Sequence, residues 1–185
     1  MNTKVSPKNQ FHINSLTNLF SYRLLQCLDG EKQLLSISSQ IQKHLSSVSV
    51  RKYLKNLEQD AKERQKDLHQ FSQEISLPVQ EVECKPLHSV LKEVQEIFSF
   101  SEPSTILDTG FLLMLREGLS MQKLQYENAL SLLTTIHKIK EHKSRIQSKI
   151  NQIYKSEKEL IKIIEGTLFS DGLEQKAYQE SPLVT

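Results

Sequence analysis

Apolar residues between positions 50 and 75 recur at alternating steps of four and three residues. The series consists of Val50, Leu54, Leu57, Ala61, Leu68, Phe71 and Ile75. One arginine, Arg64, falls in the same series. This spacing places every member on one face of an α-helix and is typical of a helix packed at a shallow angle in a bundle. The sequence therefore predicts a long bundle helix over residues 50–76, ahead of Pro78.

Similar spacing predicts three more long helices and one short helix. The long helices are expected at residues 16–44, 105–133 and 136–165, and the short one at 87–98. Ser15 is the expected N-cap of the first helix, and Gly166 is the expected C-terminal cap of the last. The chain has only 5 glycines and 5 prolines, so few residues interrupt these segments. The predicted fold class is all-α.

The connection between the second and third long helices is long enough to contain the short helix. Such a connection lets those two long helices run parallel, as in ferritin-like four-helix bundles with one long crossover. We expect one bundle domain at 13–166, a flexible N-terminus at 1–12 and a flexible C-terminal tail at 167–185. The turn between the last two helices is placed near Thr134 and Thr135.

Charge and hydropathy exclude several classes of protein. The formal net charge is only +2, so no strong basic field attracts nucleic acid. The sequence contains no apolar run long enough to cross a bilayer, and its first ten residues lack the hydrophobic core of a signal peptide. Cys27 and Cys84 show neither zinc-motif spacing nor a disulfide framework, although Cys84 would be reactive if exposed. We therefore expect a soluble, cytoplasmic protein.

One acidic residue, Glu31, falls among the inward-facing apolar residues of the first helix. Burying a lone carboxylate is costly, so it needs a partner. Arg64 and Lys143 interrupt the apolar faces of other helices and are candidate bases. Gln122 and Tyr126, four residues apart, share a face and are candidate hydrogen-bond donors. An ion pair or hydrogen-bond network is the favoured interpretation, and a metal site is the alternative.

Two further polar features have simpler interpretations. Glu157 interrupts the apolar face of the last helix, and we expect it to reach solvent from the edge of that face. His137 and Glu141 are four residues apart and could bind a metal ion at the surface. No third ligand is near them in sequence, so a solvated helix surface is the favoured interpretation.

Several local signatures, in order along the chain, resemble the bacterial stress-associated ferritin-like family typified by YciE and YciF. They are Leu19-Phe20, Glu31-Lys32-Gln33-Leu34, Cys84 ahead of the short helix, Ile106-Leu107-Asp108, and Tyr126. The resemblance covers about residues 16–165. It implies the same ferritin-like bundle that the helical spacing predicts.

Metal-competent members of that family carry Glu on the first helix and a His/Glu pair on the second. Their third helix has Glu-His-x-Glu, and their fourth has Glu with a trailing Asp. Carboxylates and imidazoles that converge from facing helices suit a pair of iron or manganese ions. By this resemblance, three of the ligand positions keep a carboxylate side chain that could ligate a metal: Glu31, Asp60 and Glu157. The other ligand positions hold Leu57, Leu119, Ser120, Gln122 and Ile153.

The resemblance thus implies a ferritin-like protein that has lost its di-iron site. We expect a non-catalytic, stress-associated helical bundle, with no cofactor and no metal. One alternative is a residual metal-binding protein with a mononuclear oxygen-ligand site formed by Glu31, Asp60 and Glu157. Another is a small-molecule binder that uses the apolar space at the replaced positions.

The third long helix is apolar around more of its circumference than one core contact needs. Leu112 and Leu113 add to its main apolar face. A contiguous exposed apolar surface favours association, so a homodimer is expected.

Overall fold

Five α-helices and no β-strand are found in residues 12–77, 80–101, 104–136 and 141–170, the part of the chain that the computed structural model describes. Four are long: α1 (Leu16–Ile41), α2 (Val48–Glu74), α4 (Thr105–Thr135) and α5 (Lys143–Ser170). The short α3 (Lys85–Ser99) lies in the crossover, and a 3-10 turn, η1 (Gln42–His44), follows α1. The four long helices and the short crossover helix confirm the predicted fold class.

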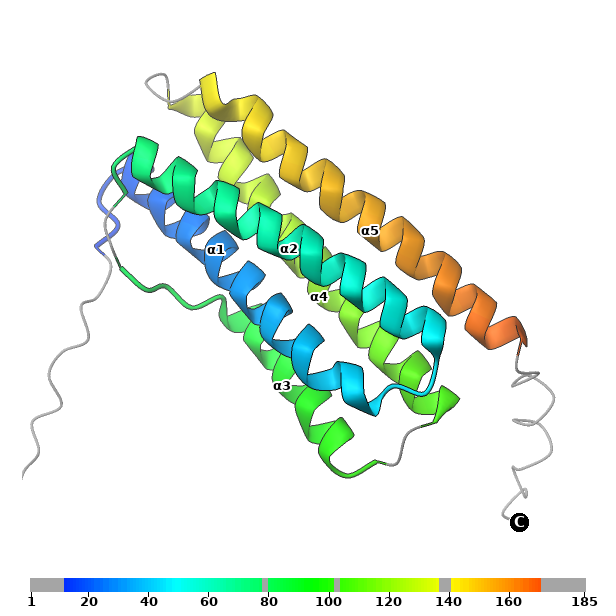
Figure 1. Cartoon of the computed structure of the whole chain (residues 1–185). Helices are drawn as coiled ribbons and strands as arrows, with labels where there is room; N and C mark the ends of the chain where they lie inside the picture. Colours follow the sequence, from blue (N-terminus) through cyan, green and yellow to red (C-terminus); the bar gives the residue numbers. More distant parts are fainter. Residues whose placement is uncertain (1–11, 78–79, 102–103, 137–140, 171–185) are drawn as a thin grey trace, which may run out of the picture.

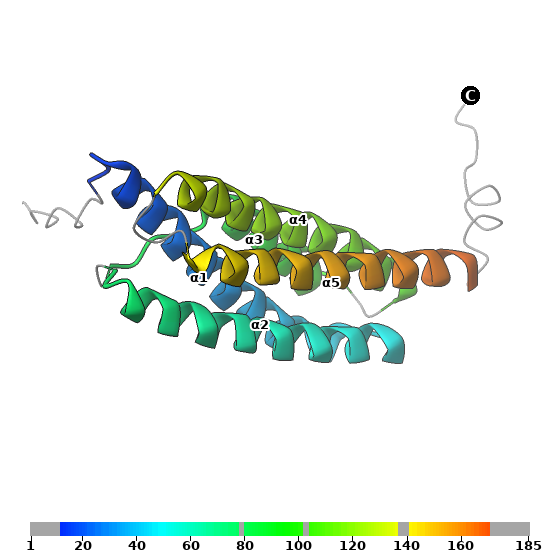
Figure 2. The ribbon, with the colours of Figure 1, turned by 90° about the horizontal axis from the view of Figure 1, so that it is seen from above.

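The long helices form two antiparallel hairpins, α1–α2 and α4–α5, that face each other (Figures 1 and 2). Helices α2 and α4 run in the same direction (Figure 1), as the long crossover predicts. Helix α3 lies along the outside of α1 and α4. The hydrophobic core therefore lies between the hairpins, with a second layer under α3.

Serine side chains set the first residue of three long helices. Ser15, Ser47 and Ser104 each accept a hydrogen bond from the backbone N–H three residues ahead, at 3.1, 3.4 and 3.1 Å respectively. Each bond satisfies an amide that has no partner inside the helix. Because Ser47 is the cap, α2 begins at Val48, two residues earlier than predicted.

Helix α3 buries its apolar face against α1 and α4. Its buried residues are Leu87, Leu91, Val94 and Phe98. Gly118 of α4 allows this close approach, because a Cβ atom there would lie 3.1 Å from a Leu87 methyl group. Leu112 is fully buried within the chain, whereas Leu113 stays 45% exposed. Part of the apolar surface on which we based the homodimer is therefore internal.

The predicted turn between the last two helices is wrong. Thr134 and Thr135 belong to α4, and α5 begins at Lys143 instead of residue 136. The sequence has no glycine or proline near this turn, so nothing in it marks the boundary. Residues 137–140, which include His137 of the predicted surface metal pair, lie outside the described residues.

The sequence predicted that Gly166 ends the last helix, and this prediction is wrong. Helix α5 continues to Ser170, so the bundle extends past the expected boundary at 166. A Cβ atom at Gly166 would meet nothing within 4 Å, and its backbone is not in the left-handed conformation of a glycine cap. Residues 1–11 and 171–185, most of the two predicted flexible ends, lie outside the described residues.

A buried carboxylate joins the start of α4 to the turn between α1 and α2. Asp108, fully buried in the first turn of α4, accepts hydrogen bonds from Ser46 N (3.1 Å), Ser47 N (2.6 Å) and Ser46 Oγ (2.8 Å). A negative charge is also favourable at the N-terminus of α4. Asp108 therefore holds the beginnings of α2 and α4 side by side.

We predict that Asp108→Ala destabilises the protein by about 2 kcal/mol, because two backbone amides lose a charged acceptor. Ser46→Ala removes only the hydroxyl bond and is the control, with an expected loss of about 1 kcal/mol. Denaturant unfolding monitored by circular dichroism measures both. An Asp108→Ala loss no larger than that of Ser46→Ala would contradict this role.

Candidate functional site

The most polar part of the core is an ion pair between α1 and α2. Glu31 and Arg64 are both 0% exposed. Arg64 Nε donates to Glu31 Oε1 at 3.0 Å, and Arg64 Nη2 donates to Glu31 Oε2 at 2.9 Å. Two parallel bonds between a guanidinium and a carboxylate are the strongest arrangement for such a pair. The pair therefore ties the two helices of the first hairpin together.

Helix α4 adds two donors to the same carboxylate. Tyr126 OH donates to Glu31 Oε1 at 2.8 Å, and Gln122 Nε2 donates to it at 3.0 Å. Gln122 Nε2 also donates to the Cys27 carbonyl oxygen at 2.8 Å. Three of the four partners predicted for Glu31 thus contact it. We call Glu31, Arg64, Gln122 and Tyr126 the core network.

Lys143, the fourth predicted partner, does not contact Glu31. It is exposed as the first residue of α5. Glu31 lies near the middle of α1, so the two residues are at different levels of the bundle. The prediction failed because it started α5 seven residues too early and placed Lys143 further inside the helix.

Burial and the Glu31 charge set the protonation of the groups around the core network. Burial, followed by the Glu31 charge, raises the pKa of Tyr126 well above its usual value and does the same for the Cys27 thiol. Burial alone would lower the pKa of Arg64, but the Glu31 carboxylate more than offsets this and the pKa is raised. The tyrosine and the thiol thus stay neutral, and Arg64 stays charged.

A close approach between α1 and α4 depends on Gly30. A Cβ atom at this position would lie 2.0 Å from Gln122 Oε1 and 2.9 Å from Gln122 Nε2. The Gln122 amide therefore occupies the space that a side chain at position 30 would need. Gln122 Oε1 and Arg64 Nη1 are buried without a hydrogen-bond partner. The sequence analysis did not identify this role of Gly30. The only indication of it in the sequence is that a glycine directly precedes Glu31.

The two other candidate oxygen ligands have their own surroundings. Asp60 is exposed on α2, and its partial burial raises its pKa, which the Arg64 charge offsets only in part. Glu157 is 7% exposed and accepts hydrogen bonds from Ser120 Oγ (2.5 Å) and Lys123 Nζ (2.6 Å) of α4. Our prediction that Glu157 reaches solvent is wrong, because α4 supplies a cation and a hydroxyl that satisfy it in place.

The apolar residues at the ligand positions are packed into the core. Leu57 is 1% exposed, and Leu119 and Ile153 are 0% exposed. Within the described residues, no group of three or more His, Cys, Asp or Glu side chains is arranged to hold a metal ion. Cys27 and Cys84 are buried free thiols, and burial raises the pKa of Cys84. Cys84 is therefore not the exposed, reactive thiol that the sequence left open.

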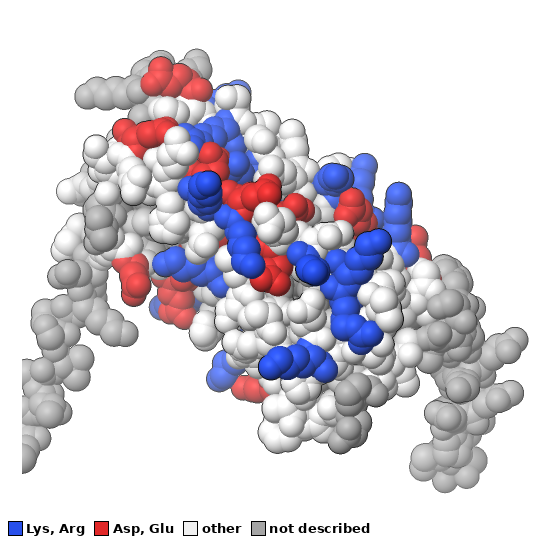
Figure 3. Space-filling model, viewed as in Figure 1, with Lys and Arg blue, Asp and Glu red and all other residues white. Residues whose placement is uncertain are grey.

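A second charged cluster, which sequence reasoning missed, joins α2 to α5. Asp67 accepts from Arg145 Nη2 at 2.6 Å and from Lys149 Nζ at 2.5 Å. Burial raises the pKa of Asp67, but the bonds from Arg145 and Lys149 outweigh burial and lower it. Acidic and basic side chains are interspersed over the middle of α2 and α5 (Figure 3). The middle of α2 and α5 is therefore a set of ion pairs with no field of one sign.

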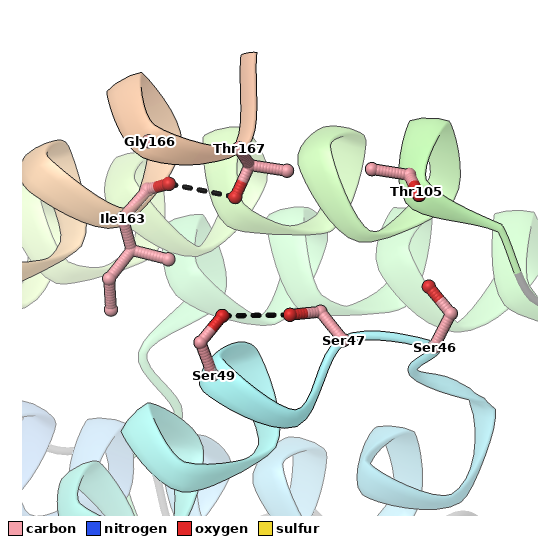
Figure 4. Close-up of a pocket in the computed structure, with 7 residues that line it drawn as sticks. All are labelled: Ser46, Ser47, Ser49, Thr105, Ile163, Gly166 and Thr167. Atoms are coloured by element: carbon pink, nitrogen blue, oxygen red, sulfur yellow. Dashed lines mark hydrogen bonds between the residues drawn. The ribbon is translucent and has the colours of Figure 1, made fainter. Parts of the chain in front are cut away.

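A hollow of about 590 Å³ lies at the end of the bundle where α2 and α4 begin (Figure 4). It is lined by Ser46, Ser47, Ser49, Thr105, Ile163, Gly166 and Thr167. Ser47 Oγ and Ser49 Oγ lie 2.8 Å apart, and Thr167 Oγ1 donates to the Ile163 carbonyl oxygen at 2.8 Å. These hydroxyls have partners within the chain, so the hollow offers little for a ligand.

Two antiparallel hairpins, a helix-containing crossover and a polar centre define a ferritin-like four-helix bundle. The chain belongs to the DUF892 family, a domain of unknown function, whose sequence model matches residues 15–166. The resemblance to the YciE/YciF-type family is thereby confirmed. No curated protein matches the sequence.

Two solved structures share the fold. The E. coli stress protein YciF superposes with a TM-score of 0.77 at 11% identity, covering 84% of this chain and 98% of its own. YcfI from Rhodopseudomonas palustris superposes with a TM-score of 0.69 at 13% identity, covering 83% and 94%. None of the described helices is long and apolar enough to span a membrane.

We predict that Arg64→Met destabilises the protein by about 3–5 kcal/mol, because Glu31 would remain buried without a counter-charge. The double variant Glu31→Leu with Arg64→Met should be more stable than Arg64→Met alone, since neither position then buries a charge. Guanidinium unfolding of the unmodified protein and the two variants measures these differences in stability. Equal stability of the single and double variants would mean that the pair does not act as a unit.

Proposed function

We propose that this protein is a non-catalytic, stress-associated helical bundle in which a buried ion pair replaces the metal centre of its ferritin-like relatives. The observation that carries the proposal is the double contact of Arg64 with both oxygens of Glu31. Glu31 is the carboxylate that the family resemblance assigns as a metal ligand. Its negative charge is already balanced by a fixed guanidinium.

The remaining donors support the same proposal, because they do not fit a dinuclear centre. A pair of metal ions needs carboxylate or imidazole ligands from facing helices, supported by outer hydrogen bonds. Here Leu57, Leu119 and Ile153 place hydrocarbon at three of those positions. Gln122 offers a neutral amide whose nitrogen, not its oxygen, faces Glu31. The Arg64 charge would in addition repel a cation beside Glu31.

The alternative is a mononuclear oxygen-ligand site formed by Glu31, Asp60 and Glu157. It would require these carboxylates to leave separate surroundings: Arg64 for Glu31, Ser120 and Lys123 for Glu157. A small-molecule site at the replaced positions is less favoured, since their side chains belong to the packed core. The ion-pair interpretation needs no such rearrangement.

We expect the unmodified protein to bind neither iron nor manganese stoichiometrically and to show no ferroxidase activity. Elemental analysis after anaerobic loading and desalting, with an iron-oxidation assay, measures both. The comparison variant combines Leu57→His, Leu119→Glu, Gln122→Glu and Ile153→Glu. It should be less stable without metal, because it buries like charges, and gain about 2.7 kcal/mol at a metal concentration 100 times Kd.

Adding Arg64→Leu to that variant should tighten metal binding further, because it removes the competing cation. Two iron or manganese ions bound to the unmodified protein would overturn the proposal. One bound ion, lost on Glu31→Gln, would favour the mononuclear alternative. If the comparison variant binds metal tightly and adding Arg64→Leu does not change its Kd, then Arg64 has no part in excluding metal.

We also propose that the protein works in the cytoplasm as a homodimer. Its two cysteines are unpaired thiols, as expected for a reducing compartment. Leu113 and Leu124 of α4 are 45% and 51% exposed and lie eleven residues apart, close to one line along the helix. They are the surface that we assign to the partner copy.

We predict that light scattering gives twice the chain mass of 21.4 kDa, and that Leu113→Lys with Leu124→Lys gives the monomer. The two lysines would have to be desolvated in the interface, whereas Gln59→Lys, at an exposed position of α2 in the other hairpin, should leave the dimer intact. A monomer mass for the unmodified protein across a wide concentration range would contradict the dimer.

A further inference from the structure

An apolar groove of about 290 Å³ lies between the end of α3 and the first turns of α4. We call it the α3–α4 groove; its apolar lining consists of Ile97, Ile106, Leu107, Gly110, Phe111 and Met114. We propose that residues 171–185 of the same chain dock in this groove and cover it. The proposal is independent of the function of the core network.

The groove leaves large apolar side chains in water. Ile106, in the first turn of α4, is 70% exposed. Ile97 on the α3 side is 38% exposed. Apolar surface gathered at one hollow, beside a fully packed core, is the usual sign of a surface that another segment covers.

A glycine in the wall keeps the groove open. A Cβ atom at Gly110 would meet nothing within 4 Å, whereas at Gly30 and Gly118 it would meet a packed side chain. A glycine inside a helix destabilises it relative to alanine. At Gly110, close packing against the described residues does not require the glycine. A side chain at this position would narrow the groove, so Gly110 leaves room there for an occupant.

The end of α5 brings residues 171–185 within reach. Thr167 of α5 and Thr105 of α4 line the same hollow (Figure 4), and Ile106 next to Thr105 borders the groove. Fifteen residues span at most about 50 Å when extended, which is ample for this distance. Helix α1 begins at the opposite end of the bundle (Figure 1), so the other terminal segment does not start beside the groove.

The composition of residues 171–185 matches an apolar groove of this size. The segment carries four large apolar or aromatic residues among polar ones: Leu173, Tyr178, Leu183 and Val184. The groove is at or below the lower end of volumes that hold a drug-sized ligand, about 300–1,000 Å³, and suits one or two side chains. Docking of such anchors needs no ordered partner from outside the chain.

The chain contains no tryptophan, so one introduced residue reports on its own surroundings. We would make Tyr178→Trp and Leu183→Trp separately in the full-length protein and record fluorescence emission. Docking predicts that at least one of the two tryptophans emits at a shorter wavelength in the protein than the same tryptophan does in a free peptide of residues 171–185. It also predicts that the shift is independent of protein concentration.

Adding Gly110→Glu should move the emission of that reporter back to the value of the free peptide. The Gly110→Glu side chain would enter the groove and not the core, and circular dichroism checks that the bundle remains folded. Ser131→Glu, exposed at the other end of α4, is the matched control and should leave the shift unchanged. Emission at the peptide value for both reporters would overturn the proposal. So would a shift that appears only at high concentration, since a second copy would then supply the segment.

Discussion

A carboxylate removed from water must be neutralised where it stands, and Glu31 imposes this condition on three helices at once. Arg64 fixes the axial position of α2 against α1, because a guanidinium fork binds both oxygens in only one register. Tyr126 and Gln122 fix α4 against the same oxygen. Apolar contacts alone would tolerate small sliding movements between helices. The core network thus sets the level at which the two hairpins meet.

Much of this could be predicted from the sequence, because the spacing of apolar residues follows directly from the period of the helix. Glu31 and Arg64 were recognisable for the same reason: each is a charge on an otherwise apolar face, and two opposite charges in one core have to meet. Glu157 was misjudged because its partner Lys123 lies on another helix, and only packing brings the two together. The start of α5 was misjudged because no breaker residue marks it.

The contacts that hold the loops between helices could not be predicted from the spacing of residues in the sequence. Asp108 binds the turn at Ser46 across 62 residues of chain, and Asp29 of α1 binds the backbone N–H of Cys84, at the start of α3, across 55 residues at 2.8 Å. In both cases a side-chain carboxylate satisfies backbone amides of a distant loop. Such pairs follow no periodicity, since any acidic residue near a helix end can serve. They nevertheless hold the start of α3 and the turn before α2 in place.

The contact between Gly30 and Gln122 joins two positions that are 92 residues apart in the sequence. A methyl group at position 30 and an amide at position 122 require the same volume, so the two residues cannot vary independently. In an alignment of relatives that share this packing, alanine or serine at the first position should occur together with a shorter residue at the second. Such paired variation would reveal the α1–α4 packing from sequences alone. It would also separate relatives with a filled core from those that keep room for other side chains.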